Sequence, residues 1–93
     1  DVYVVSIGDD AKFRAIQLLH QLRQQGLSAD MDYTGRKIKA QFKAAARYNA
    51  KFVITIGEDE LAKNIGQVKN MDTGDQKEVS LDDIHVYLQR EME

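Results

Sequence analysis

Two short apolar runs most constrain what this chain can fold into. Val2–Ile7 and Phe52–Ile56 are rich in β-branched and aromatic residues, and a glycine follows each run. Runs of this length and composition are typical of strands buried on both faces, which occur in parallel sheets covered by helices. The segments between and beside the two runs are therefore expected to supply those helices.

Apolar residues at helical spacing predict a first helix directly after Gly8. Asp9 or Asp10 is placed to cap its start, and Gly26 is placed to end it in the left-handed conformation. Its core-facing side chains are expected to be Phe13, Ala15, Ile16, Leu18, Leu19 and Leu22.

A second helix is expected over residues 37–49, after Gly35. Its apolar side chains are expected to pack on the sheet, and they are Ile38, Phe42, Ala45 and Ala46.

The remaining segments predict three more strands and a last helix. A short strand is expected at residues 27–31, and two more lie around 67–71 and 77–80, joined by Asp-Thr-Gly-Asp, which is a hairpin signal. A helix then runs from residue 81 to the end of the chain. A separate strand at 62–65 is a less favoured alternative.

These elements predict one domain over residues 1–93 of the α/β class, with three layers (α/β/α). Right-handed crossovers between parallel strands place the first two helices on opposite faces if the first three strands have the order 2-1-3. The hairpin then extends the sheet, giving a five-stranded mixed sheet of order 2-1-3-4-5 with three helices. Ninety-three residues are enough for one such core and not for two.

Positive charge is concentrated in one part of the chain. The net charge is −2, which argues against a non-specific nucleic-acid binder. Yet residues 33–57 contain no acidic residue and six of the thirteen basic ones, namely Arg36, Lys37, Lys39, Lys43, Arg47 and Lys51. At helical spacing, four of these fall within a stripe of about 80° and can lie along a phosphate backbone, namely Arg36, Lys39, Lys43 and Arg47. The alternative interpretation is an ordinary solvated helix face.

No catalytic or metal-binding constellation is predicted. Five carboxylates follow the two apolar strands, at Asp9, Asp10 and residues 58–60, and they would repel a nucleotide phosphate. A divalent metal site there is a less favoured alternative, because acidic caps at a helix start explain Asp9 and Asp10 without one. A response-regulator receiver is excluded because Phe52–Ile56 ends in glycine and lacks a phosphoacceptor aspartate. The chain has no cysteine, and His20 and His85 have no partner at metal-ligand spacing.

Three segments in order resemble the C-terminal anticodon-binding domain of histidyl-tRNA synthetases. They are the lysine-rich run at 35–45, the strand and Gly-Glu-Asp-Glu-Leu turn at 52–61, and the hairpin at 68–76. Threonyl, prolyl and glycyl synthetases share the fold, and the Thr-Gly-Asp-Gln hairpin favours the histidyl family. Asn64, Asn70 and Gly66 depart from the family pattern around the fourth strand.

The resemblance implies a non-catalytic, cytoplasmic domain, without a membrane segment, that holds the anticodon loop of histidine tRNA. A separate catalytic domain of the same chain would activate histidine with ATP and Mg²⁺, in a homodimeric parent ligase. Family positions point to Gly35, Arg36, Lys43, Glu60 and Lys69, with Glu60 accepting from a guanine edge or serving only as a helix cap. The basic stripe adds Lys39 and Arg47, and Tyr33 is placed to stack on an unpaired base.

Two other functions remain open on the sequence. One is a regulatory or protein-interaction domain that kept the fold and lost anticodon reading. The other is a small free-standing enzyme using the carboxylates after the strands, for which base, nucleophile and cofactor motifs are missing. The preserved basic stripe together with Glu60 favours the RNA-binding interpretation.

Overall fold

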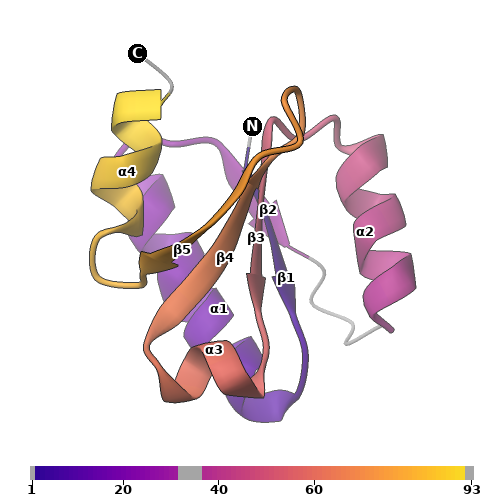
Figure 1. Cartoon of the computed structure of the whole chain (residues 1–93), viewed down its shortest axis with the longest axis vertical. Coiled ribbons are helices and arrows are strands. Elements are labelled where there is room, and N and C mark those ends of the chain that lie inside the picture. Colours follow the sequence, from indigo (N-terminus) through magenta and orange to yellow (C-terminus); the bar gives the residue numbers. More distant parts are fainter. Residues whose placement is uncertain (1, 32–36, 92–93) are drawn as a thin grey trace.

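The computed structural model describes residues 2–31 and 37–91, and it contains one mixed sheet with helices on both faces (Figure 1). The strands are β1 (Val2–Ser6), β2 (Ala29–Met31), β3 (Phe52–Ile56), β4 (Ile65–Asn70) and β5 (Gln76–Ser80). The helices are α1 (Asp9–Gln24), α2 (Ile38–Arg47), α3 (Glu58–Ala62) and α4 (Ile84–Glu91).

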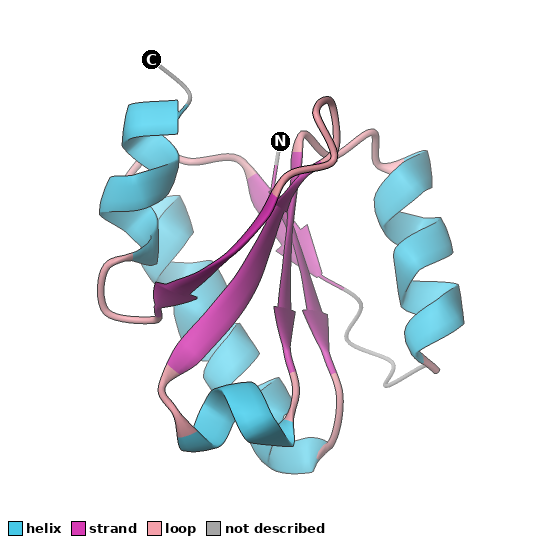
Figure 2. Ribbon diagram, viewed as in Figure 1, coloured by secondary structure: helices cyan, strands magenta, loops and turns pink. Residues whose placement is uncertain are grey.

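The strand order is β2-β1-β3-β4-β5, as predicted. β1 pairs in parallel with both β2 and β3, whereas β4 pairs antiparallel with β3 and with β5. The two parallel connections run through α1 and α2, which lie on opposite faces of the sheet (Figure 2). The α/β class and the expected three layers are therefore confirmed.

One helix was not predicted. The segment between β3 and β4, expected as a turn, contains the single-turn helix α3. Glu60, the third residue of the helix, stabilises its start by accepting a hydrogen bond from the Gly57 N–H. The described residues therefore hold four helices and not three.

The larger core lies between the sheet and the layer of α1 and α4. Its fully buried side chains include Phe52, Ile54 and Ile56 from β3, and its other large members are Leu18, Leu19, Leu22, Leu81, Ile84 and Leu88. The core under α2 is smaller. It consists of Tyr3, Val5, Ala45, Ala50 and Val53, with Ala44 and Tyr48 packed against it.

The predicted core face of α1 is wrong at Phe13, whose side chain is 72% exposed. The buried residues of this helix are Ala11, Ala15, Leu18, Leu19 and Leu22. Phe13 lies two residues from Ala11 and from Ala15, so a rotation of about 100° per residue turns it to the opposite side of the helix.

The predicted apolar face of α2 is also partly wrong. Phe42 and Ala46 are exposed, whereas Gln41 and Ala45 are buried. Phe42 directly follows Gln41, and Ala46 directly follows Ala45. One position along a helix is a rotation of about 100°, which turns each of the two exposed side chains away from the sheet. The side chain of Ile38 lies outside the described residues.

The ends of α1 follow the prediction only at its C-terminus. Gly26 adopts the left-handed conformation (φ 84°), as expected, and the Leu27 N–H donates to the Leu22 carbonyl at 3.0 Å. At the start, the cap residue is Gly8, without a side-chain hydrogen bond. Asp9 and Asp10 lie inside the first turn and do not cap the helix. Their negative charges instead interact favourably with the positive end of the helix dipole.

Gly66, which departs from the family pattern, is explained by packing. A Cβ atom built at this position would lie 3.0 Å from Ile54 Cγ2 and 3.0 Å from Ile84 Cδ1. Isoleucine side chains from β3 and α4 therefore occupy the space that a branched residue on β4 would need.

Across residues 2–31 and 37–91, no helix has both the length and the apolar character needed to cross a membrane.

Candidate nucleic-acid interface

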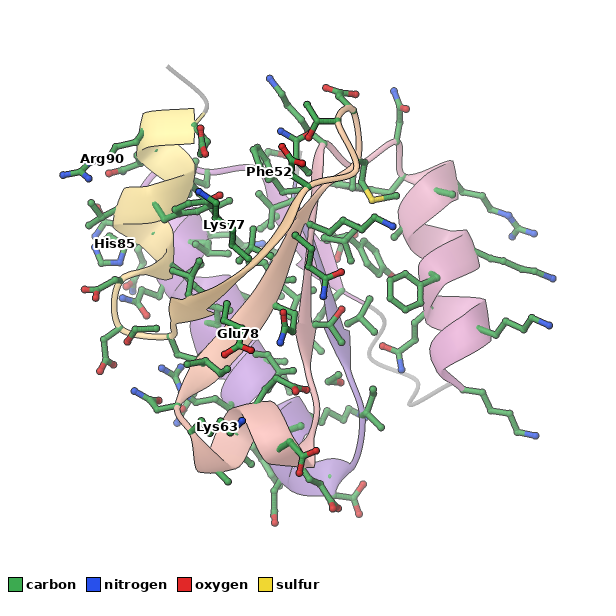
Figure 3. The ribbon with its side chains drawn as sticks, in the orientation of Figure 1. Phe52, Lys63, Lys77, Glu78, His85 and Arg90 are labelled. Carbon is green, nitrogen blue, oxygen red and sulfur yellow. The ribbon has the colours of Figure 1, made fainter. Side chains whose placement is uncertain are left out.

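The basic stripe of α2 is presented to solvent. Lys39, Lys43 and Arg47 are all exposed, and they lie on the side of the helix opposite Gln41 and Ala45. Figure 3 shows the nitrogen-tipped side chains of α2 pointing away from the sheet. Within the described part of the chain, none of the three has a carboxylate within ion-pair distance. These cations are therefore available to phosphates. Arg36, the fourth predicted member of the stripe, lies outside the described residues.

A second polar surface lies on the face of the sheet that α2 only partly covers. The smaller core beneath α2 includes residues of β1 and β3 and none of β4 or β5. Among the described helices, α2 alone lies on this face, beside β1 and away from β5 (Figure 1). No described helix therefore covers the outer part of this face.

The residues of the open sheet face follow from strand alternation. Val68 is buried in the larger core, so its neighbours Gln67 and Lys69 point to the opposite face. On β5, Glu78 pairs with Gln67 and Gln76 pairs with Lys69. The Gln76 Nε2 group donates to Gln67 Oε1 at 3.2 Å, which agrees with a shared face. We call Gln67, Lys69, Gln76 and Glu78 the open-face residues.

The open-face residues offer the groups that read unpaired bases. Two amides supply both donors and acceptors, Lys69 supplies a cation and Glu78 supplies an acceptor. Sequence reasoning identified Lys69 and missed the other three. The alternation of Gly66 and Val68 with polar neighbours was the available signal, but it becomes informative only once the buried face of β4 is known.

Glu60 has a structural role that the sequence left open. The Gly57 N–H donates to Glu60 Oε1 at 2.9 Å, and the Leu61 N–H donates to the Gly57 carbonyl at 2.9 Å. The carboxylate therefore caps α3. A carboxylate has two acceptor oxygens, and this contact uses one of them.

We expect Glu60→Ala to lower the free energy of unfolding by about 1 kcal/mol, because it removes the cap from Gly57. Glu60→Gln keeps an oxygen that accepts from the same N–H, so its unfolding midpoint in urea should stay close to that of the unaltered protein. Equal destabilisation by both changes would show that the charge matters and not the cap.

The structure separates two predicted site residues. Lys69 pairs with Val53, near the start of β3, whereas Glu60 follows the end of that strand. Val53 and Gly57, the residue that follows β3, are four positions apart, and four residues of extended chain span about 13 Å. A ligand that contacts both residues must therefore run along the strand direction.

Three predicted residues, Tyr33, Gly35 and Arg36, lie outside the described residues. Of the other tyrosines, Tyr3 and Tyr48 pack together, with ring centroids 5.8 Å apart. Tyr87 packs against the larger core, and desolvation, followed by its hydrogen bond to Glu91, raises the pKa of its hydroxyl. These three tyrosines therefore serve in packing.

The described residues contain no group of three or more histidine, cysteine, aspartate or glutamate side chains that could hold a metal ion. His85 Nδ1 instead lies 3.4 Å from Gln21 Nε2, between α4 and α1. The described surfaces whose charged and polar groups can bind a ligand are thus the basic stripe of α2 and the open-face residues. Together they define an α/β domain with the features of a single-stranded nucleic-acid binder.

Comparison with known proteins agrees with this class. Residues 1–91 match the sequence profile of the family described as the anticodon binding domain. The chain therefore belongs to the anticodon-binding domain family.

The similar proteins are histidyl-tRNA synthetases. The chain is 51% identical over 92 residues to a histidine–tRNA ligase of a Geobacillus species, covering 99% of this chain and 22% of that protein. It thus spans about a fifth of the length of the curated relatives it matches. The structure of the apo Staphylococcus aureus histidyl-tRNA synthetase superposes with a TM-score of 0.88 at 47% identity, covering 94% of this chain and 25% of that one.

The RNA-binding domain of threonyl-tRNA synthetase from Cryptosporidium parvum shares the fold. Its TM-score is 0.86 at 20% identity, over 97% of this chain and 23% of that chain. The predicted assignment to the anticodon-binding domain of a histidyl-tRNA synthetase is confirmed, and the threonyl alternative shares only the fold.

Proposed function

We propose that this domain binds the anticodon loop of histidine tRNA. The observation that carries the proposal is the exposed stripe of Lys39, Lys43 and Arg47, which has no carboxylate partner among the described residues and flanks an open polar sheet face. Phosphate contacts position single-stranded RNA, whereas contacts to base edges read its sequence.

The two surfaces suit these two tasks. Lysine and arginine side chains on α2 bind the phosphate backbone without regard to sequence. The open-face residues lie on a rigid sheet and carry amide and carboxylate groups that distinguish one base edge from another. Glu60, with one oxygen used in the cap of α3, contributes a further acceptor to the loop.

The rest of the function concerns the longer protein. We propose that the parent chain is a homodimeric, cytoplasmic histidine–tRNA ligase, whose separate catalytic domain uses ATP and Mg²⁺ to join histidine to its tRNA. This domain takes no part in that chemistry. It holds the tRNA while the catalytic domain acts on the other end of the molecule.

The test is a titration of the 93-residue chain with a histidine-tRNA anticodon stem-loop and with a copy whose anticodon bases are changed, at low salt. Tighter binding of the native loop supports anticodon reading. Equal and salt-sensitive binding of both loops would leave only a basic surface. If neither loop binds, the comparison is repeated with the longer ligase, and no preference there favours a regulatory or protein-interaction domain.

We expect Lys43→Ala and Lys69→Ala to weaken binding in different ways. Lys43 lies on the phosphate-facing stripe, so its loss should weaken the native and altered loops by a similar factor. Lys69 lies among the open-face residues, so its loss should also narrow the difference between the two loops, with about 1–3 kcal/mol of discrimination at stake. The measurement is the ratio of the two dissociation constants for each variant. An equal change of this ratio in both variants would contradict the assignment of phosphate contact to Lys43 and of base discrimination to Lys69.

A further inference from the structure

Gln41 is one of two polar residues among the described buried ones, and it connects α2 to the sheet. Its side chain is on the inner side of α2, and the residue is 3% exposed. Gln41 Nε2 donates to the Ser6 carbonyl at 2.8 Å, and Gln41 Oε1 accepts from the Ser6 N–H at 3.1 Å. One amide side chain thus pairs with both backbone groups of a residue 35 positions away.

The pairing satisfies the backbone of β1 beyond the described part of β2. The described pairing of β1 with β2 reaches Met31, opposite Val4, and Ser6 lies two residues further along β1. The Val2 N–H donates to Ser28 on the β2 side, and the Ile7 N–H donates to Ile56 on the β3 side. Because successive residues of a strand alternate, the N–H and carbonyl of Ser6 point to the β2 side. Gln41 supplies there the peptide-like partner that these buried groups need.

Among the described side chains of α2, the apolar ones that contact the smaller core are the small Ala44 and Ala45. Tyr48 and Ala50, which follow the helix, also pack on this core. Alanine side chains bury little apolar area and interlock weakly with a sheet. The directional pair of hydrogen bonds from Gln41 therefore fixes the position of the helix more closely than alanine packing does.

We propose that Gln41 is a positioning residue for RNA binding, which fixes α2 on β1 so that its basic stripe stays at a set distance from the open-face residues. The inference rests on the proposed function. Lys39 and Lys43 lie on either side of Gln41 in the sequence and on the outer side of the same helix. We call the two hydrogen bonds between Gln41 and Ser6 the Gln41 lock. When this lock is intact, one RNA strand can contact the stripe and the sheet face together, and binding does not first have to order the helix.

The test is a double-mutant cycle on the 93-residue chain. Gln41→Met keeps the length of the side chain and removes both hydrogen bonds, and it is made alone and in a Lys39→Ala/Lys43→Ala background. Alone, it should weaken the native stem-loop by about 10-fold at low salt and flatten the salt dependence, because contacts to phosphate are lost. In the background without the lysines it should have almost no further effect. The matched control is Gln17→Met, at an exposed glutamine on α1, and it should bind as the unaltered chain does.

Amide hydrogen exchange tests the lock without a variant or RNA. In the unaltered chain, the Ser6 amide should exchange as slowly as its neighbours in β1, because Gln41 Oε1 accepts a hydrogen bond from it. Rapid exchange at Ser6 would overturn the proposal, and this measurement serves if Gln41→Met does not fold.

The outcomes separate this inference from the proposed function. Lack of preference of the unaltered chain and of the longer ligase for the native loop contradicts the proposed function, and the positioning role with it. If that preference holds and Gln41→Met weakens binding by the same factor in both backgrounds, the positioning role alone is overturned. Near-additive effects mean that Gln41 acts on something other than the lysines.

Discussion

Replacing Phe52 with alanine is expected to lower the free energy of unfolding by about 3–5 kcal/mol. Phe52 begins β3 and is 1% exposed in the larger core (Figure 3). The change removes the ring from a site lined by two neighbouring strands and the helices that cover them. A domain of this size has about 5–15 kcal/mol of stability in total, so the variant is expected to unfold at much lower urea concentration.

Phe13→Ala is the matched control for this prediction. It removes the same ring from the exposed side of α1, where the side chain is 72% exposed. Its effect on the urea midpoint should correspond to no more than about 0.5 kcal/mol. A large loss at Phe13 would mean that the core face of α1 predicted from the sequence is right and the one in the structure is wrong.

Removing the basic stripe with Lys39→Ala, Lys43→Ala and Arg47→Ala together is expected to weaken anticodon-loop binding by about 100-fold at about 50 mM salt. Each phosphate contact with a single strand contributes about 0.7 to the slope of log affinity against log salt, so the slope should fall by about 2. Fluorescence anisotropy at several salt concentrations measures both quantities. Because all three side chains are exposed, the urea midpoint should change little.

The control for the triple variant removes the same charge elsewhere. Lys63, Lys77 and Arg90 are exposed, and Figure 3 places them on the side of the molecule away from α2. Their combined replacement by alanine should weaken binding far less than loss of the stripe, through the change in net charge alone. Equal losses in the two triple variants would show that RNA binding follows total charge and not the position of the stripe.

The proposal that Gln41 positions α2 refines this expectation. If the stripe acts from a fixed place, its contribution depends on a residue that carries no charge and contacts no ligand. Loss of the lock should then reproduce part of the effect of losing Lys39 and Lys43. The alanine variants of the stripe measure the effect of the charge itself, and Gln41→Met measures the effect of how firmly α2 holds that charge in place.

Much of the fold could be predicted because its signals are local. The β-branched runs of β1 and β3 stay buried on both faces in any arrangement, and crossover handedness then leaves few sheet orders. The Asp-Thr-Gly-Asp turn and the left-handed Gly26 are likewise decided within a few residues. The exposure of Lys39, Lys43 and Arg47 followed from helical spacing alone.

The tertiary structure decided which side of each element is covered. Phe13 and Phe42 are as apolar as any core residue, and only the position of the neighbouring layers exposes them. The open sheet face exists because α2 lies over part of the sheet, and the role of Gln41 depends on its hydrogen bonds to Ser6, 35 positions away. Such facts depend on contacts between residues far apart in the chain, which spacing along the sequence does not encode. The sequence by itself therefore determined the strands, their order, three of the four described helices and the basic stripe. The tertiary structure determined what lies beside that stripe and what holds it in place.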